Sequence, residues 1–147
     1  MDLSKIPELQ KRSAQYVANL SANIVRVVET NQGKIVDFNR SQMIGSKDAE
    51  GKSLTHKSTG STKLSKAYAR RTGKTKPNLF DSGQFQDGMF LIMPSEKEYF
   101  ISSKDHKTQW LSENYGSIFG VAPNNQDKAK AMNDKAIIED YQKSVFQ

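Results

Sequence analysis

The sequence predicts an α+β domain in which helices from both ends of the chain pack on a small antiparallel β-hairpin. Near both ends, apolar residues recur at three- and four-residue steps, the period of an amphipathic helix. Between them, two short apolar runs flank a Pro-Ser-Glu-Lys turn, which is typical of a hairpin. The length of 147 residues favours a single domain. We expect it to comprise a helical region at 6–44, an extended basic arm at 45–78, a turn and hairpin at 79–102 and a C-terminal helical region at 103–147.

The first helix is predicted to run without a break from Ile6 to Thr30, about seven turns. Ser4 is the expected capping residue, and Pro7 is tolerable in the first turn because its missing N–H would have no partner there. Its apolar stripe consists of Ile6, Leu9, Tyr16, Val17, Leu20, Ile24, Val27 and Val28.

A second helix is predicted over 34–43, packed against the first. Gly33 is expected to end or kink the first helix, since glycine takes the left-handed cap conformation at little cost. Ile35 and Phe38 would face the first helix, together with Met43 or Ile44.

The segment 46–78 carries the excess positive charge. It contains nine Lys and Arg residues against two acidic ones, a net charge of +7 in a chain whose total is +6. Periodicity is absent apart from a helical turn expected near 63–70, and a loop this long favours binding or ordering by a partner. The residues expected to contact a partner or DNA are Lys47, Lys52, Lys63, Lys66, Arg70, Arg71, Lys74 and Lys76.

A turn at Asp81, Ser82 and Gly83 leads into the hairpin, whose strands are predicted at 89–93 and 98–102. Asp and Ser satisfy local backbone donors, and Gly83 can take a positive φ. Because both strands are almost continuously apolar, we expect them to be buried against the helices.

The C-terminal region is predicted to contain a short helix over 108–114 and a longer one over 125–145, capped by Asn124 or Asn125. The apolar stripe expected on the longer helix consists of Ala131, Ile137, Ile138, Tyr141 and Val145. Trp110, Tyr115 and Phe119 could form a stacking surface for bases, although at near-helical spacing such residues more often form a core or an interface.

The residues present favour a non-enzymatic protein. There is no cysteine, and the two histidines, His56 and His106, have no i+4 partner, so neither a thiolate site nor a zinc site is expected. We therefore expect no catalytic residue, metal, cofactor or small-molecule substrate. No window approaches the roughly 20 apolar residues of a membrane span, so no membrane contact is expected.

Several short motifs resemble the virion-morphogenesis and tail-completion proteins of tailed bacteriophages. They are Asp-Ala-Glu-Gly-Lys at 48–52, Thr-Lys-Leu-Ser-Lys at 62–66, Leu-Phe-Asp-Ser-Gly-Gln-Phe at 79–85 and Met-Phe-Leu-Ile at 89–92. The segments 107–111 and 115–120 are similar to neck or ring proteins of crAss-like phages.

This resemblance implies a structural virion protein, assembled in the host cytoplasm, that forms a ring in the portal, neck or tail-completion region. Its implied partners are further copies of itself and other neck, portal or tail proteins, with non-specific contact with packaged DNA left open. The alternative is a small basic nucleic-acid-binding protein that acts alone through the 46–78 segment.

Overall fold

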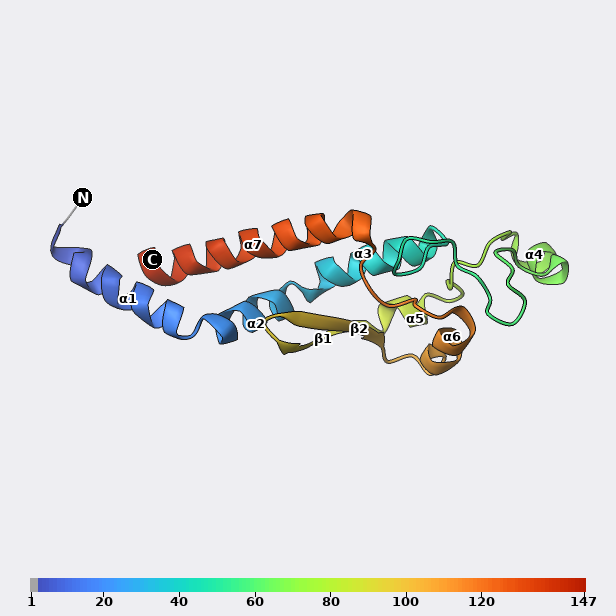
Figure 1. Ribbon diagram of the computed structural model, residues 1–147, viewed down its shortest axis with the longest axis horizontal. Coiled ribbons are helices and arrows are strands. Elements are labelled where there is room, and N and C mark those ends of the chain that lie inside the picture. The colour runs from blue at the N-terminus through green and yellow to red at the C-terminus, as the bar shows by residue number, and fades with distance from the viewer. Residues whose placement is uncertain (1–2) are drawn as a thin grey trace.

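The computed structural model describes residues 3–147 and confirms the α+β class. Three helices follow one another along the long axis of the molecule, and the C-terminal helix lies alongside them (Figure 1). In chain order the helical elements of this rod are a 3-10 turn at Leu3–Lys5, α1 (Ile6–Ala18), α2 (Leu20–Thr30), α3 (Gln32–Ile44) and α7 (Pro123–Phe146).

The prediction of one unbroken N-terminal helix is wrong, because Asn19 separates α1 from α2. Its backbone has φ −108° and ψ 21°, and its side-chain amide donates a 3.0 Å hydrogen bond to the carbonyl oxygen of Gln15. Asparagine competes in this way for backbone carbonyls and so interrupts helices. The apolar period continues across the interruption, which is why periodicity did not reveal it.

The second helix does not fold back on the first. Asn31 alone links α2 to α3, so α3 continues in nearly the same direction as α2 (Figure 1). The side-chain amide of Asn31 donates a 2.9 Å hydrogen bond to the backbone carbonyl oxygen of Val27. Gly33 lies inside α3 and does not take the left-handed cap conformation. One linking residue is too short for the chain reversal that an antiparallel helix pair needs.

The predicted caps also differ from the structure. Lys5 precedes the first residue of α1, and Ser4 lies within the 3-10 turn. Ala122 precedes α7, which begins at Pro123, one to two residues before the predicted asparagine caps. The fixed φ of Pro123 suits the first helical position, so α7 starts there without a capping side chain.

The predicted hairpin is confirmed, with β1 at Met89–Ser95 and β2 at Glu98–Ser103. The strands are antiparallel, with Met89 opposite Ser103 and Leu91 opposite Ile101. These residues form the buried face, which packs against α2 and α3.

The other face of the hairpin is uncovered, so the expectation that the strands are buried against the helices holds for one face only. Ile92 and Phe100 lie opposite each other on this face, and both side chains are exposed, Phe100 at 56%. A two-stranded sheet with helices on one side leaves alternate residues in solvent, whatever their polarity.

The core lies where α3, the buried hairpin face and the segment before α7 meet. Ile35, Met43 and Ile118 are completely buried there. Burial of a side chain of this size stabilises a fold by about 1.5–3 kcal/mol. Met43, not Ile44, completes the buried face of α3.

The C-terminal helix buries only part of the predicted stripe: Val145 is buried and Ile137 and Tyr141 are half-buried, but Ala131 is exposed. Ala129 and Val145 are its buried residues, whereas Ile138 is exposed. Because α7 packs against α1 and α2 along only one side, its remaining apolar residues face outward.

The basic segment contains more structure than expected. A short helix, α4 (Lys66–Thr72), falls close to the predicted turn, and two isolated β-bridges join Lys47 to Ser53 and His56 to Ser61. Leu54, between them, is buried at 1% exposure. Ordering of this segment by a partner stays a prediction.

Candidate functional site

The predicted turn before the hairpin forms one wall of a cavity. Gly83 has φ +90°, as predicted, and precedes the short helix α5 (Gln84–Asp87). Leu79 also takes a positive φ, +55°, which a branched side chain adopts only at a cost. Two left-handed residues within five positions therefore give this turn its sharp path.

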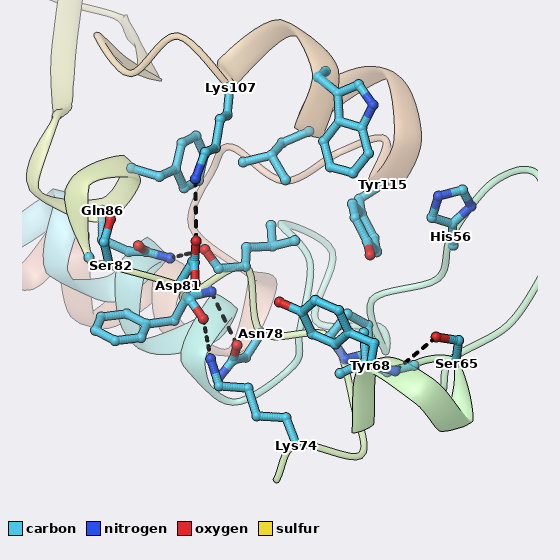
Figure 2. A pocket seen from close by; sticks show the side chains of 18 residues that line it. His56, Ser65, Tyr68, Lys74, Asn78, Asp81, Ser82, Gln86, Lys107 and Tyr115 are labelled. Atoms are coloured by element: carbon cyan, nitrogen blue, oxygen red, sulfur yellow. Dashed lines mark hydrogen bonds and ion pairs between the residues drawn. The ribbon is translucent and has the colours of Figure 1, made fainter. Parts of the chain in front are cut away.

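Aromatic side chains form the opposite walls (Figure 2). Tyr68 lies on α4, while Trp110 and Tyr115 lie on α6 (Thr108–Tyr115). The Ser65 hydroxyl accepts a 3.2 Å hydrogen bond from the Tyr68 backbone and so caps α4. The cavity is open on one side and has a volume of about 560 Å³, within the range of small-molecule sites.

One polar side chain of the cavity wall has a buried oxygen without a partner. Gln86, on α5, is 4% exposed, and its Nε2 donates a 2.7 Å hydrogen bond to the carbonyl oxygen of Leu79. Its Oε1 accepts no hydrogen bond. A buried acceptor without a donor costs about 1–3 kcal/mol, so this side chain lowers the stability of the cavity wall.

Two lysines and one carboxylate add charge to the same wall (Figure 2). The Lys107 Nζ lies 3.5 Å from Asp81 Oδ2; the Asp81 side chain is largely exposed and that of Lys107 is partly buried. The Lys74 ammonium donates a hydrogen bond to the Phe80 carbonyl oxygen and lies 5.5 Å from the centre of the Phe80 ring. The wall thus presents two cations against one anion.

A smaller hollow of about 360 Å³ adjoins the cavity. The two share wall residues, among them His56, Leu64 and Tyr115, and the smaller one adds Lys63. The ring of His56 lies edge-on to Tyr115, with the ring centres 5.3 Å apart. Burial raises the pKa of Tyr115 above its ordinary value of 10.0.

The structure distributes the eight predicted basic contact residues over several surfaces. Lys74 lines the main cavity and Lys63 the smaller hollow, whereas Lys47 and Lys52 lie beside the first β-bridge, where Lys52 pairs with Glu50. The remaining four are exposed on or just after α4, namely Lys66, Arg70, Arg71 and Lys76. Arg71 also lies over the Tyr68 ring at 5.0 Å.

Sequence reasoning missed two polar residues of the cavity wall, Gln86 on α5 and Lys107 directly before α6. Of the three aromatics considered as a stacking surface, Trp110 and Tyr115 do line the cavity, whereas Phe119 packs against Phe85 in the core. No periodicity signal precedes Gln86, because α5 is only four residues long.

A second, more open groove lies between α1 and α7. Its volume is about 690 Å³, and apolar side chains dominate its wall, including Leu9, Val17 and Phe146. Val17 is 60% exposed. This groove lies at the end of the molecule opposite α4 (Figure 1).

Comparison of the chain with protein-family models, curated proteins and solved structures finds no match. Among residues 3–147, no group of three His, Asp or Glu side chains is placed to hold a metal ion. None of the helices in this described part has the length and apolar character needed to cross a membrane.

Proposed function

We propose that the chain is a structural virion protein that forms a ring in the portal, neck or tail-completion region of a tailed phage and joins head to tail through protein contacts. The resemblance of the 79–85 turn and its neighbouring motifs supports the phage assignment. The exposed surfaces of the fold support assembly into a ring, as follows.

The observation that carries the proposal is that α7 covers only part of the apolar stripe of α1. Tyr16 is the buried residue of this helix, whereas Ile6 and Val17 are exposed, as is Leu20 just beyond it. Single exposed apolar residues are ordinary, but several on one helix beside an open groove indicate a protein–protein interaction surface.

Two apolar surfaces of different shape favour a ring over a symmetric dimer. The α1–α7 groove is concave, and the outer face of the hairpin presents Ile92 and Phe100. If the hairpin face of one copy meets the groove of the next, the contact is heterologous, and repetition of a heterologous contact closes into a ring when the rotation permits.

The basic segment supplies a third surface, at the end that carries α4. In this proposal its cations pair with acidic surface of an adjacent subunit or ring, or face the DNA passage. Replacement of Arg70, Arg71, Lys74 and Lys76 by alanine tests that contribution. DNA contact weakens steeply with salt, whereas a largely apolar clamp does not.

Sedimentation velocity with one charge introduced in the groove tests the ring proposal. Val17→Glu is expected to dissociate the oligomer, because it places a carboxylate on the apolar surface. Gln15→Glu introduces the same charge on an exposed residue of the same helix and should leave assembly unchanged. Equal behaviour of the two variants, with circular dichroism showing both folded, would count against the groove as an interface.

The alternative function, a nucleic-acid-binding protein acting alone, is favoured by the net charge of +7 within 46–78. It predicts a monomer that binds oligonucleotides with a strong salt dependence. The same sedimentation measurement separates the two functions, since the alternative requires no oligomer.

A further inference from the structure

We propose that residues 63–76, which we call the α4 lobe, bind the phosphate backbone of duplex DNA independently of base sequence. This inference deepens the proposed ring function and rests on it for the DNA that passes through a portal or neck. It also confines the DNA contact to one part of the 46–78 segment. The charge of the lobe, its preformed helix and the position of its one aromatic ring carry the inference.

The α4 lobe carries the whole net charge of the protein. Six of the 22 basic residues lie within it, whereas all 16 acidic residues lie elsewhere, so the rest of the chain has no net charge. An uncompensated cluster of cations attracts a polyanion, and another copy of the chain presents no net negative surface to it. The six residues are Lys63, Lys66, Arg70, Arg71, Lys74 and Lys76.

The cations of the lobe are available to a partner. None of the six forms an ion pair with the described residues 3–147, and all except the half-buried Lys74 are exposed. Lys74 donates a hydrogen bond to the Phe80 carbonyl oxygen, and Arg71 lies over the Tyr68 ring. The side chains of the other four donate no hydrogen bond within the described part of the chain.

The earlier half of the basic segment belongs to the body of the fold. Residues 46–57 contain three lysines and two acidic residues, and Lys52 pairs with Glu50. The Ala49 N–H donates a 2.8 Å hydrogen bond to the Ser117 carbonyl oxygen, and Leu54 is buried. This half is fixed against the segment before α7 and is nearly neutral, which leaves the lobe as the part that binds DNA.

The lobe is a preformed unit at the end of the molecule opposite both termini (Figure 1). The Leu64 N–H donates a 3.0 Å hydrogen bond to the Thr75 carbonyl oxygen and closes the base of the lobe. Ser65 caps the start of α4, and Gly73, with φ +70°, ends the helix. Because the helix exists before contact, little conformational entropy is lost when its cations bind.

The one aromatic side chain of the lobe lines the cavity and is not free for a base (Figure 2). Tyr68 is half-buried, and the Arg71 guanidinium lies 5.0 Å from the centre of its ring. Proteins that bind single strands present aromatic rings on which bases stack, whereas non-specific binding to a duplex depends on its phosphates. The lobe therefore fits the backbone of a duplex.

Fluorescence anisotropy of a labelled duplex of mixed sequence, titrated with the full chain at about 50 to 300 mM salt, tests the proposal. We expect the logarithm of the binding constant to fall with the logarithm of salt concentration with a slope of about −4 for each bound copy, since each phosphate neutralised by the four free cations contributes about −0.9. Lys66→Gln combined with Arg70→Gln should weaken binding at least about tenfold at low salt and reduce the slope by about 2. Lys34→Gln combined with Lys128→Gln removes the same charge from two exposed residues outside the lobe and should leave affinity and slope nearly unchanged.

Three results would overturn the proposal. They are the absence of binding at about 50 mM salt, which would leave an acidic protein surface as the partner of the lobe, an equal loss of affinity in the two double variants, and tighter binding to a single strand of the same length.

These results are distinguishable from failure of the ring. Both double variants retain the groove and the hairpin face, so they should form the wild-type oligomer in sedimentation velocity. Binding of duplex DNA by a chain that never forms an oligomer would reject the ring and support the alternative function, with the lobe still as the binding site.

Discussion

The side chain of Asn39, on α3, donates a 2.8 Å hydrogen bond to the backbone carbonyl oxygen of Ile118, a residue 79 positions later in the chain. Its oxygen accepts a 3.1 Å hydrogen bond from the Gly120 backbone. One completely buried amide thus fixes the segment that connects α6 to α7 against the long helical rod. The cavity wall formed by α6 is positioned through this contact.

Replacement of Asn39 by alanine should lower the free energy of unfolding by roughly 2–4 kcal/mol, because it leaves a buried carbonyl and a buried N–H without partners. Urea denaturation measures the change. Ser41→Ala, an exposed position on the same helix, is the matched control and should change stability by less than about 0.5 kcal/mol. Similar losses in the two variants would contradict the role given to Asn39.

A second long-range contact joins α1 to α7. The Tyr16 hydroxyl donates a 2.8 Å hydrogen bond to Asp140, which also accepts a 2.6 Å hydrogen bond from Arg26. Tyr16→Phe should destabilise the fold by about 1 kcal/mol. In an Asp140→Ala background the same substitution should have a smaller effect, and an unchanged effect in this double-mutant cycle would show that the two side chains do not interact.

The contacts among Tyr16, Arg26 and Asp140 also predict a loss of stability at acid pH. The hydrogen bond from Arg26 is the main reason that the pKa of Asp140 lies below its ordinary value of 3.8. A carboxyl group with a lowered pKa stabilises the fold above that ordinary value, and the contribution is lost as pH falls through the lowered pKa. The stability difference between wild type and Asp140→Asn should therefore narrow below about pH 4, and a constant difference would contradict the account.

At alkaline pH, Tyr16 determines how the stability of the fold changes with pH. Burial, with the hydrogen bond to Asp140, raises the pKa of Tyr16 from 10.0 to about 12. Its contribution is present below pH 10 and declines between 10 and 12 as the folded protein is forced to ionise. Wild type should lose more stability than Tyr16→Phe over this interval in urea titrations, and parallel losses would argue against the raised pKa.

Two glycine substitutions should have opposite effects. Gly83→Ala should cost about 1–2 kcal/mol, because φ +90° is unfavourable for a residue with a Cβ. Gly33→Ala should stabilise α3 by about 0.5 kcal/mol, since a Cβ there meets nothing within 4 Å. Thermal unfolding of both variants checks the contrast, and destabilisation by Gly33→Ala would contradict the helical assignment.

The sequence was sufficient to predict the elements with a strong local signal. The hairpin has alternating burial around a short turn, and Gly83 has the conformation that its place in an Asp-Ser-Gly turn requires. The amphipathic periods located the terminal helices to within a few residues. These features depend on interactions between residues close in the chain.

What could not be predicted depends on contacts between distant segments. Nothing in the local sequence of Asn39 or Gln86 indicates that the first would bond across 79 positions or that the second would line a cavity. The exposure of Ile138 and Phe100 depends on how many elements are available to cover them. Periodicity identifies an apolar face but not whether the rest of the chain has anything to cover it.

The central claim is head-to-tail assembly, and native mass spectrometry of variants with a charge introduced on one or the other apolar surface tests it most directly. Wild type is expected to give a closed oligomer, while Val17→Glu in the groove and Phe100→Glu on the hairpin should each give monomers. An equal mixture of the two variants should form heterodimers and nothing larger, because each retains the surface that the other has lost. A wild-type monomer at every concentration, or a mixture without heterodimers, would contradict the account.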